Sequence, residues 1–245
     1  MLLGFWKLTW VETKVFVREP MGVIGSLLVP VILFVVIGRS IGIRAGAAAE
    51  AAPFNVAVLA ALFIAIGAVL SLVAIISIYR EGGILKRLRA TPLSPITILG
   101  CHVVVKLLFT VIGMALLMLA GRRFFPGVMQ VNVVSFTAAV LLGTMSILSL
   151  GFVIASIVPT ARFAQPLGAS LMYPMVAFSG LFFPLERMPA WVRVIANALP
   201  TTHAVSLMQG VWDGAGWGPH LGDVAALVLI AAACVALSSR VFRWE

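Results

Sequence analysis

The residues that commonly carry enzymatic chemistry are few in this sequence, and their spacing matches none of the usual catalytic or metal-binding patterns. The three histidines, His102, His203 and His220, show no HExxH or comparable zinc spacing. A phosphate-binding P-loop needs a Gly-Lys pair, and none of the lysines follows a glycine. The cysteines, Cys101 and Cys234, lack metal-ligand spacing. The sequence therefore does not favour an enzyme, which needs a nucleophile–base pair or a metal cluster.

Composition places the chain in a membrane. Of its 245 residues, 62% are hydrophobic and 10% are charged, too few charges to cover the surface of a soluble domain. The formal net charge is +9, but the lysines and arginines stand at the edges of apolar runs. Anionic lipid headgroups account for that placement, and no basic stripe with interleaved aromatics indicates nucleic-acid binding.

Six stretches are long and apolar enough to span a bilayer as helices, each having roughly 17 residues or more. They lie at about Met21–Gly38, Phe54–Tyr79, Ile96–Ala120, Val131–Val158, Gln165–Phe183 and Leu221–Ser239. The first could be mistaken for a signal peptide, but the long aromatic segment before it carries Glu12 and Glu19. The prediction is an all-α integral membrane protein with a single domain over residues 1–245.

Six spans place both termini on the same side, and the basic residues indicate which side that is. The termini and the loops at 80–95 and 159–164 hold more lysines and arginines than the opposite loops. Because positive loops stay in the cytoplasm, we expect a multi-pass protein of the inner (cytoplasmic) membrane with both termini cytoplasmic.

Residues 5–19 are predicted to form an amphipathic helix at the membrane interface. On a helical projection Lys7, Lys14 and Arg18 share one stripe, bordered by Trp6 and Trp10. Glu12 lies on the far side of this helix. The helix could position the first span or simply anchor the chain, and these two interpretations are compatible.

The loop at 80–95 is the most informative segment. Gly82-Gly83 lets the chain turn out of the second span, and Thr91-Pro92 stops a short helix that presents Leu85 and Leu88 on one side and basic residues on another. Two interpretations stay open. It is either an ordinary positive cytoplasmic loop or a helix that docks on a partner.

The long segment at 184–220 contains two helix-like pieces, at about Ala190–Leu199 and Thr202–Trp212. Both are apolar and too short to span, so we expect them to lie on or dip into the outer leaflet. The alternative is a folded outer loop with interfacial tryptophans. Inside the third span, Lys106 is expected to snorkel toward the cytoplasmic face, with a substrate or coupling role as the alternative, and His102 is expected to be a plain interfacial residue.

Taken together, these segments resemble the permeases of the ABC-2 transporter family, and more closely its drug-resistance and nodulation-factor exporter branch. The resemblance rests on three motifs: "EGGILKRLRATPLSP" at 81–95, "FSGLFFPLERMPAWVRVIANALPTTHAV" at 178–205, and "REP" at 18–20. These motifs occur in the family's order and spacing over nearly the whole chain.

The resemblance implies a connecting helix at 5–19, a coupling helix that docks on a separate ATPase, and re-entrant helices at 184–220. Two permease copies and two ATPase copies would form the working unit, as a homodimer or a heterodimer of permeases. This chain would need no cofactor, because ATP and Mg would bind the ATPase. The implied docking residues are Arg80, Glu81, Gly82, Gly83, Leu85, Lys86, Arg87, Leu88, Arg89, Thr91 and Pro92.

We therefore expect export of a hydrophobic or amphipathic molecule such as a drug, lipid or glycolipid. Candidate substrate contacts, for which plain packing is the alternative, are Phe34, Met172, Tyr173, Phe178 and Phe182. One rival is a secondary transporter driven by an ion gradient, which would require buried acidic residues or broken helices at mid-membrane. A second rival is an intramembrane enzyme or a scaffold without transport activity.

Overall fold

A computed structural model describes residues 2–45, 55–84, 95–125, 131–157 and 160–241. The described residues form helices, short helical turns and connections, with no strand among them. The helices are α1 (Leu2–Arg18), α2 (Pro20–Val23), α3 (Val29–Ala45), α4 (Val56–Glu81), α6 (Pro95–Phe124), α7 (Val133–Ile157), α8 (Ala161–Ala177), α9 (Ala190–Asn197), α10 (Pro200–Trp212) and α11 (Leu221–Val241). A π-helical turn, η1 (Ile24–Leu28), joins α2 to α3, and 3-10 turns form η3 (Leu185–Arg187) and η4 (Gly218–His220).

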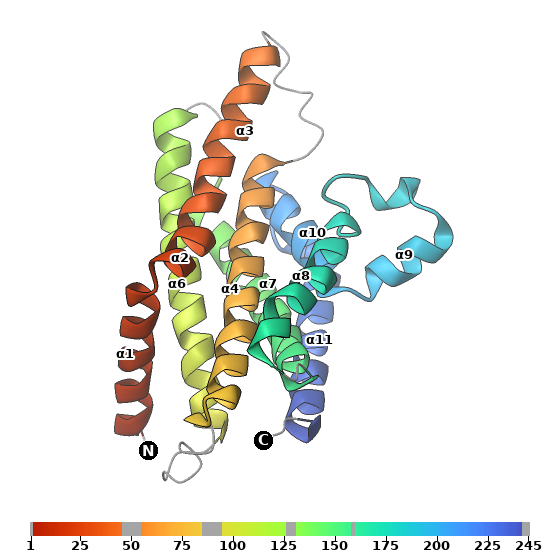
Figure 1. The fold of residues 1–245 in the computed structure, drawn as a ribbon. Coiled ribbons are helices and arrows are strands. Elements are labelled where there is room, and N and C mark those ends of the chain that lie inside the picture. The colour runs from red at the N-terminus through yellow and green to blue at the C-terminus, as the bar shows by residue number, and fades with distance from the viewer. Residues whose placement is uncertain (1, 46–54, 85–94, 126–130, 158–159, 242–245) are drawn as a thin grey trace.

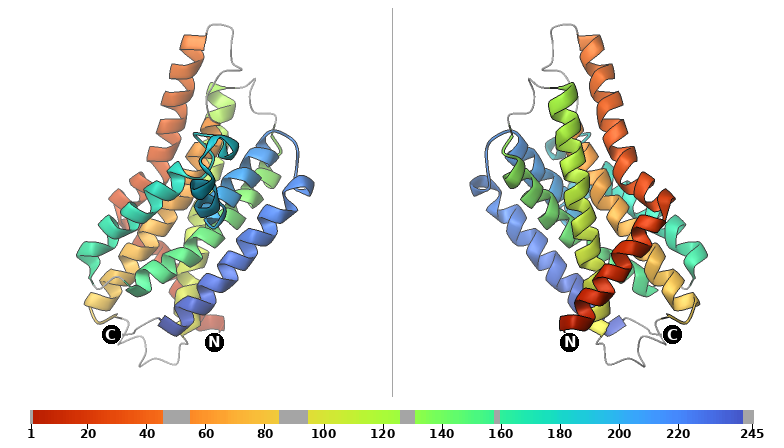
Figure 2. Two further views of the ribbon diagram at one scale, coloured as in Figure 1. Left: turned by 90° about the vertical axis from the view of Figure 1, so that its right-hand side faces the viewer. Right: turned by 90° about the vertical axis from the view of Figure 1, so that its left-hand side faces the viewer.

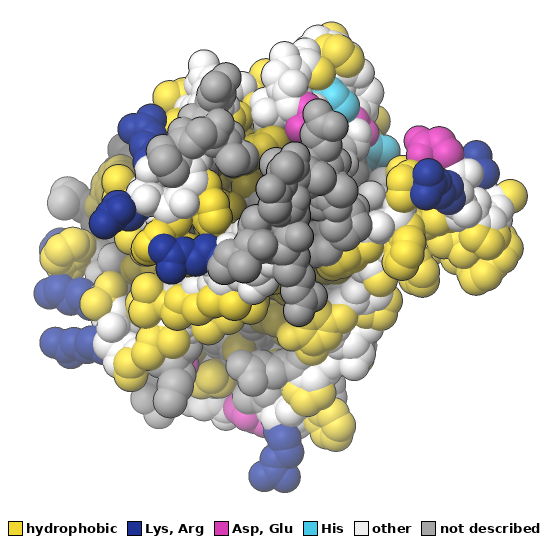
Figure 3. Space-filling model, turned by 90° about the horizontal axis from the view of Figure 1, so that it is seen from above, with side chains coloured by type: hydrophobic (Ala, Val, Ile, Leu, Met, Phe, Trp, Pro, Cys, Tyr) yellow, Lys and Arg dark blue, Asp and Glu magenta, His cyan; other side chains and the backbone are white. Residues whose placement is uncertain are grey.

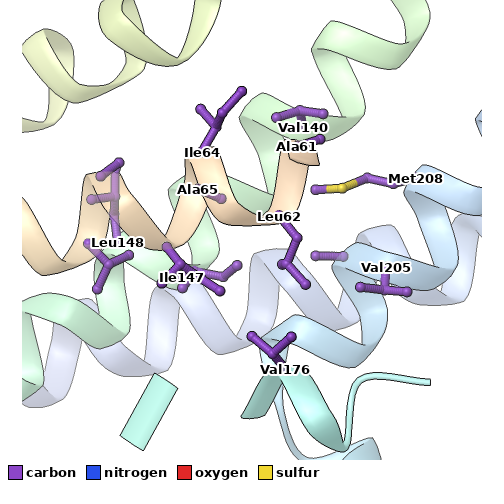
Figure 4. Packing of buried hydrophobic residues seen from close by; sticks show 14 of the residues in the cluster. Ala61, Leu62, Ile64, Ala65, Val140, Ile147, Leu148, Val176, Val205 and Met208 are labelled. Carbon is purple, nitrogen blue, oxygen red and sulfur yellow. The ribbon is translucent and has the colours of Figure 1, made fainter. Parts of the chain in front are cut away.

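Helix α4 is the centre of the bundle, and most of its length is buried. It begins at Asn55, whose Oδ1 accepts hydrogen bonds from the backbone N–H groups of Ala57 and Val58 at 3.0 and 3.1 Å. Its sequence is apolar on every side, as expected of a helix that other helices surround. Figure 4 shows Leu62 of α4 among side chains from α7, α8 and α10.

Four helical stretches of the described chain are long and apolar enough to cross a membrane. They are Val56–Glu81, Gly100–Phe124, Val133–Ser156 and Gly218–Ser238, and they coincide with the second, third, fourth and sixth predicted spans. The predicted first span corresponds to a shorter apolar helix, Ile24–Ser40, whose first five residues are the π-helical turn η1. The predicted fifth span ends early, because α8 stops at Ala177. The six-span count therefore stays a prediction.

The two ends of the bundle differ. The start of α1 and the end of α11 lie at the same end, which we call the terminal end, and the opposite end is called the distal end (Figure 1). In the right-hand view of Figure 2, α1 crosses in front of the part of α6 near the terminal end. Helix α3 then continues toward the distal end (Figure 1).

Both helix-like pieces predicted between 184 and 220 are helices, but their surroundings differ. Helix α10 is buried against α7 and α11, so its apolar side chains meet protein. Helix α9 lies outside the body of the bundle, at the right in Figure 1 and in front in the left view of Figure 2. It exposes Trp191 and Val194. The expectation that both helices lie on or dip into the outer leaflet stays a prediction, and α10 would do so while packed in protein.

Candidate docking site and the polar cluster beside it

The predicted docking segment begins where α4 ends. Gly82 donates its backbone N–H to the carbonyl of Ile78 at 2.9 Å, and Gly83 follows with φ of +65°, a left-handed conformation that favours glycine. The sequence prediction that Gly82-Gly83 turns the chain out of this helix is thus confirmed. Glu81 is exposed, and the Arg80 guanidinium donates to the carbonyl of Ala155 on α7 at 2.8 Å.

Most of the predicted docking residues lie outside the described part of the chain. These are Leu85, Lys86, Arg87, Leu88, Arg89, Thr91 and Pro92. Arg80, the first residue of the predicted docking segment, is half-buried, and its hydrogen bond to Ala155 joins the end of α4 to the end of α7. The structure therefore fixes where the docking segment begins, at the terminal end of the bundle, and its role in docking stays a prediction.

The five residues of the predicted interfacial helix share the exposed face of α1. Trp6, Lys7, Trp10, Lys14 and Arg18 are all exposed, and the Lys14 ammonium lies 5.1 Å from the centre of the Trp10 ring. The opposite face is buried and packs against α6. This arrangement is amphipathic, as the sequence predicts, and contact of the exposed face with lipid stays a prediction.

The buried face of α1 carries an acidic residue into contact with α4 and α6. Glu12 accepts a hydrogen bond from the Tyr79 hydroxyl at 2.8 Å, and its second oxygen lies 3.6 Å from Nδ1 of His102. The Tyr79 and His102 rings meet edge to face with centroids 5.5 Å apart. Glu12 thus links the first helix to both helices that flank the 80–95 loop.

Lys106 adjoins this group and is buried. Its ammonium donates to the Ser71 hydroxyl at 2.6 Å and lies 4.1 Å from the centre of the Phe16 ring. Only 5% of Lys106 and 3% of His102 is exposed. The predictions of a snorkelling Lys106 and an interfacial His102 are therefore wrong, because α1 packs over this side of α6 and covers both. We call Glu12, Ser71, Tyr79, His102 and Lys106 the α1–α4–α6 polar cluster.

Sequence reasoning missed Glu12, although a signal was present. A single acid opposite a stripe of basic residues and tryptophans is out of place on an interfacial helix unless it meets a polar partner. Burial raises the pKa of the Glu12 carboxyl above its ordinary value, and the Tyr79 hydrogen bond and the nearby Lys106 partly oppose that rise. A cavity of about 20 Å³ borders the cluster, lined among others by Glu12, Ser71 and Lys106. It is about the size that holds one water molecule.

The candidate substrate contacts do not share one environment. Phe34 and Met172 are buried in the core, and Phe34 meets Phe125 edge to face with centroids 5.4 Å apart. Phe178 and Phe182 are partly buried, whereas 57% of Tyr173 on α8 is exposed. Packing accounts for the first two, and a role in binding substrate stays a prediction for all five.

In the part of the chain that the structure describes, no group of three or more histidine, cysteine or acidic side chains is placed to hold a metal ion.

The chain matches a known protein family. The family described as ABC-2 type transporter matches residues 4–212, from the first turn of α1 to the last residue of α10. The matched region includes the segment at 80–95 and the α1–α4–α6 polar cluster. No curated protein matches the chain.

Proposed function

The chain belongs to the ABC-2 type transporter family and is the membrane permease component of an ABC transporter, and we propose that it exports a hydrophobic or amphipathic molecule using a separate ATPase subunit. The single observation that carries this proposal is the match over residues 4–212, which spans every predicted element except the last helix. A drug, a lipid or a glycolipid fits the apolar composition better than an ion does.

The energy would come from another chain. This sequence has no Gly-Lys pair and hence no P-loop, so ATP and Mg would bind an ATPase subunit. We place that subunit against the segment from Arg80 to Pro92. Two permease copies, identical or different, and two ATPase copies would form the transporter. Six spans and cytoplasmic termini in the inner membrane complete the proposal, supported by the basic residues around the terminal end.

The fold supports a simple route from docking to transport. Helix α4 ends at the proposed docking segment and runs through the centre of the bundle, so a push at its end would reach the core. The Arg80 bond to Ala155 would pass the same movement to α7. The α1–α4–α6 polar cluster joins the helices on both sides of the segment, so they would move with α1. ATP binding would then shift the balance between two arrangements through contacts that differ between them.

Reversing the charge of one adjacent basic pair tests the docking proposal. Affinity purification of the wild-type chain from native membranes should recover a P-loop ATPase, identified by mass spectrometry. Lys86→Glu with Arg87→Glu should lose it, because the acidic pair would repel the acidic or polar surface that the basic pair meets. A second adjacent pair at the other end of α6, Arg122→Glu with Arg123→Glu, is the control and should retain the ATPase.

Two results would refute the proposal: a wild-type preparation without any ATPase, or a Lys86/Arg87 variant that recovers as much ATPase as the control. Each result is read against the amount of permease in the membrane, so a loss of expression is not mistaken for a loss of docking.

One observation favours a second candidate, transport driven by an ion gradient. That class uses buried ionisable residues, and Glu12, His102 and Lys106 are buried together. Efflux of a lipophilic fluorescent dye from membrane vesicles separates the two candidates. Efflux by an ATP-driven exporter stops when ATP is depleted and continues when a protonophore is added. Efflux by a proton-driven transporter continues without ATP and stops when the protonophore is added.

A further inference from the structure

A second polar cluster lies near the distal end, where three elements meet around one carboxylate. Asp223, in the first turn of α11, has Oδ1 at 2.7 Å from Nδ1 of His203 on α10. Its Oδ2 accepts from the Ser206 hydroxyl at 2.7 Å and lies 3.0 Å from Nδ1 of His220 on η4. Figure 3, viewed toward the distal end, shows histidine and acidic side chains side by side on that face.

His203 has an acceptor at each of its ring nitrogens. Nδ1 faces the Asp223 carboxylate, and Nε2 lies 3.0 Å from the backbone carbonyl oxygen of Asn197, the last residue of α9. A carbonyl and a carboxylate can only accept hydrogen bonds, and a neutral imidazole has a single N–H to donate. Both contacts form together only when His203 carries a proton on each nitrogen.

We propose that His203 and Asp223 form a proton-binding site whose occupancy holds α9 against the rest of the bundle. With the proton bound, the imidazolium bridges the end of α9 to the start of α11. When the proton leaves to water, the neutral ring keeps its bond to Asp223 and turns an unprotonated Nε2 toward the Asn197 carbonyl. The contact to α9 is then lost, because two acceptors face each other.

The site can exchange protons with solvent and yet is sheltered. The side chain of His203 is 19% exposed and that of Asp223 is 20% exposed. The imidazolium also lies at the carboxyl end of α9, where the helix dipole favours positive charge. The Asp223 carboxylate accepts from the Ser206 hydroxyl and faces the rings of His203 and His220, so polar groups surround it.

Other charged groups around His203 do not supply a competing partner. On α9, Arg193 donates to the carbonyl of Met188 at 3.4 Å, and on η4, His220 shares the Asp223 carboxylate. Helix α7 contains no charged residue and no histidine. The other titratable residues of α4 and α8, and those toward the end of α11, stand at the terminal end of the bundle, are exposed, or are far along the helix from Asp223. They are Tyr79, Arg80, Glu81, Arg162, Tyr173, Cys234 and Arg240, and Asp213 just after α10 is exposed.

The consequence falls on α9, because this helix has little else to hold it. It packs mainly against α10 and η3, and it exposes Trp191, Val194 and Ile195. Loss of the His203 bond would therefore loosen α9 more than any other helix. The direction follows from the two contacts: the attachment of α9 is complete while both ring nitrogens of His203 carry a proton, and loss of one proton weakens it.

Nitrogen-15 NMR of the histidine rings tests the proton site directly, because the whole chain contains only three histidines. The protein, labelled with ring 15N histidine in lipid nanodiscs, is titrated from acid to alkaline pH. One ring should donate N–H hydrogen bonds from both of its nitrogens, and His203→Gln should remove that signal. The proposal is overturned if no ring donates from both nitrogens at any pH, or if that signal survives in the variant.

A nitroxide on α9 tests the mechanical consequence. Val194→Cys, an exposed position, is labelled in a Cys234→Ala background in which Cys101 is buried. The nitroxide should become more mobile as the pH rises in the parent protein and should be insensitive to pH after His203→Gln. The matched control, His220→Gln, should keep the response, since it leaves both His203 bonds in place.

Two nitroxide results would overturn the proposal. In the first, the mobility of the nitroxide does not change with pH in the parent protein. In the second, the response to pH disappears with His220→Gln and persists with His203→Gln. If His203→Gln fails to fold, the NMR titration and the nitroxide titration of the parent protein still decide it. Neither measurement depends on the transport substrate or on an ATPase, so its failure leaves the proposed function standing.

Discussion

Glu12 shows how one residue can tie an amphipathic helix to the body of a membrane protein. Glu12 is 6% exposed, and its carboxylate contacts Tyr79 from α4 and His102 from α6. A buried acid is costly unless it has partners, and each partner here belongs to a different helix. A shift of α1 would separate the carboxylate from both partners. The contacts therefore fix the position of α1 as well as stabilising the carboxylate.

The raised pKa of Glu12 makes a prediction about stability and pH. A carboxyl whose pKa is raised on folding binds its proton more tightly in the folded state. Its contribution to stability is therefore complete below the ordinary value of 4.5 and is lost as the pH rises through the raised pKa. Glu12→Gln, which stays neutral and can still accept from Tyr79, should escape this loss.

The measurement is the melting temperature in detergent of the wild type and of Glu12→Gln between pH 4 and 8. The melting temperature of Glu12→Gln should exceed that of the wild type by the smallest amount at acid pH, and this difference should grow as the pH rises. Glu19→Gln is a suitable control, because Glu19 is exposed and its removal should give a difference that changes little with pH. An advantage of Glu12→Gln that grows toward acid pH would show the sign of the argument to be wrong.

Helix packing depends on glycines at the crossing points. A Cβ on Gly143 of α7 would lie 2.9 Å from Cβ of Ala204 and 3.0 Å from Cε of Met208, both on α10. A Cβ on Gly151 would lie 2.9 Å from a methyl group of Val69 on α4. Small residues let helices approach closely in membranes, where van der Waals contact drives much of the association. These positions set how deeply α10 and α4 seat against α7.

Gly143→Ala should therefore destabilise the protein by about 1–3 kcal/mol through overpacking. Gly222→Ala in the first turn of α11 is the matched control, since no atom lies within 4 Å of its added Cβ. It should be neutral or stabilise the protein by up to about 1 kcal/mol through helix propensity. Melting temperatures of both variants in one detergent check the pair. A Gly143→Ala variant as stable as Gly222→Ala would mean that α10 is loosely seated.

The sequence was informative about individual elements and less so about their partners. The Gly82-Gly83 turn and the helices at 190–212 could be predicted, because glycine, proline and apolar spacing act locally. The burial of Lys106 could not, because it depends on α1, which is nearly ninety positions away in sequence, covering that side of α6. The burial of α10 could not either, since an apolar helix of its length suits lipid and protein equally well. The His203 site combines residues whose spacing carries no motif.

At the scale of the whole molecule, two helices, α8 and α10, meet in the region where the sequence predicts a single fifth span. Helix α8 starts close in sequence to the end of α7, at the terminal end, and has 17 residues, about 26 Å at 1.5 Å per residue. Helix α10 continues from there: the Thr201 hydroxyl in its first turn donates to the Met175 carbonyl of α8 at 2.9 Å. Its last residue, Trp212, reaches the Phe136 ring near the start of α7, with centroids 5.1 Å apart.

A passage in two pieces is tolerated inside a bundle, because protein rather than lipid surrounds the break. Thr201 is fully buried at this junction. If α8 and α10 together made one crossing, then α4, α6, α7, this pair, α11 and the α2–α3 segment would give the six spans that the sequence predicts. Six crossings would bring both termini to one side of the membrane, which agrees with the start of α1 and the end of α11 lying at the same end in Figure 1.

This arrangement predicts where two exposed positions lie relative to the membrane. Glu81 belongs to the terminal end and Asp213, just after α10, to the distal end. With a Cys234→Ala background, a membrane-impermeant maleimide should label Glu81→Cys only from the cytoplasmic side and Asp213→Cys only from outside, tested in inverted vesicles and in intact cells. Labelling of both from one side would rule out a complete fifth crossing. The reverse pattern would put the docking segment outside the cell, where no ATPase could drive it.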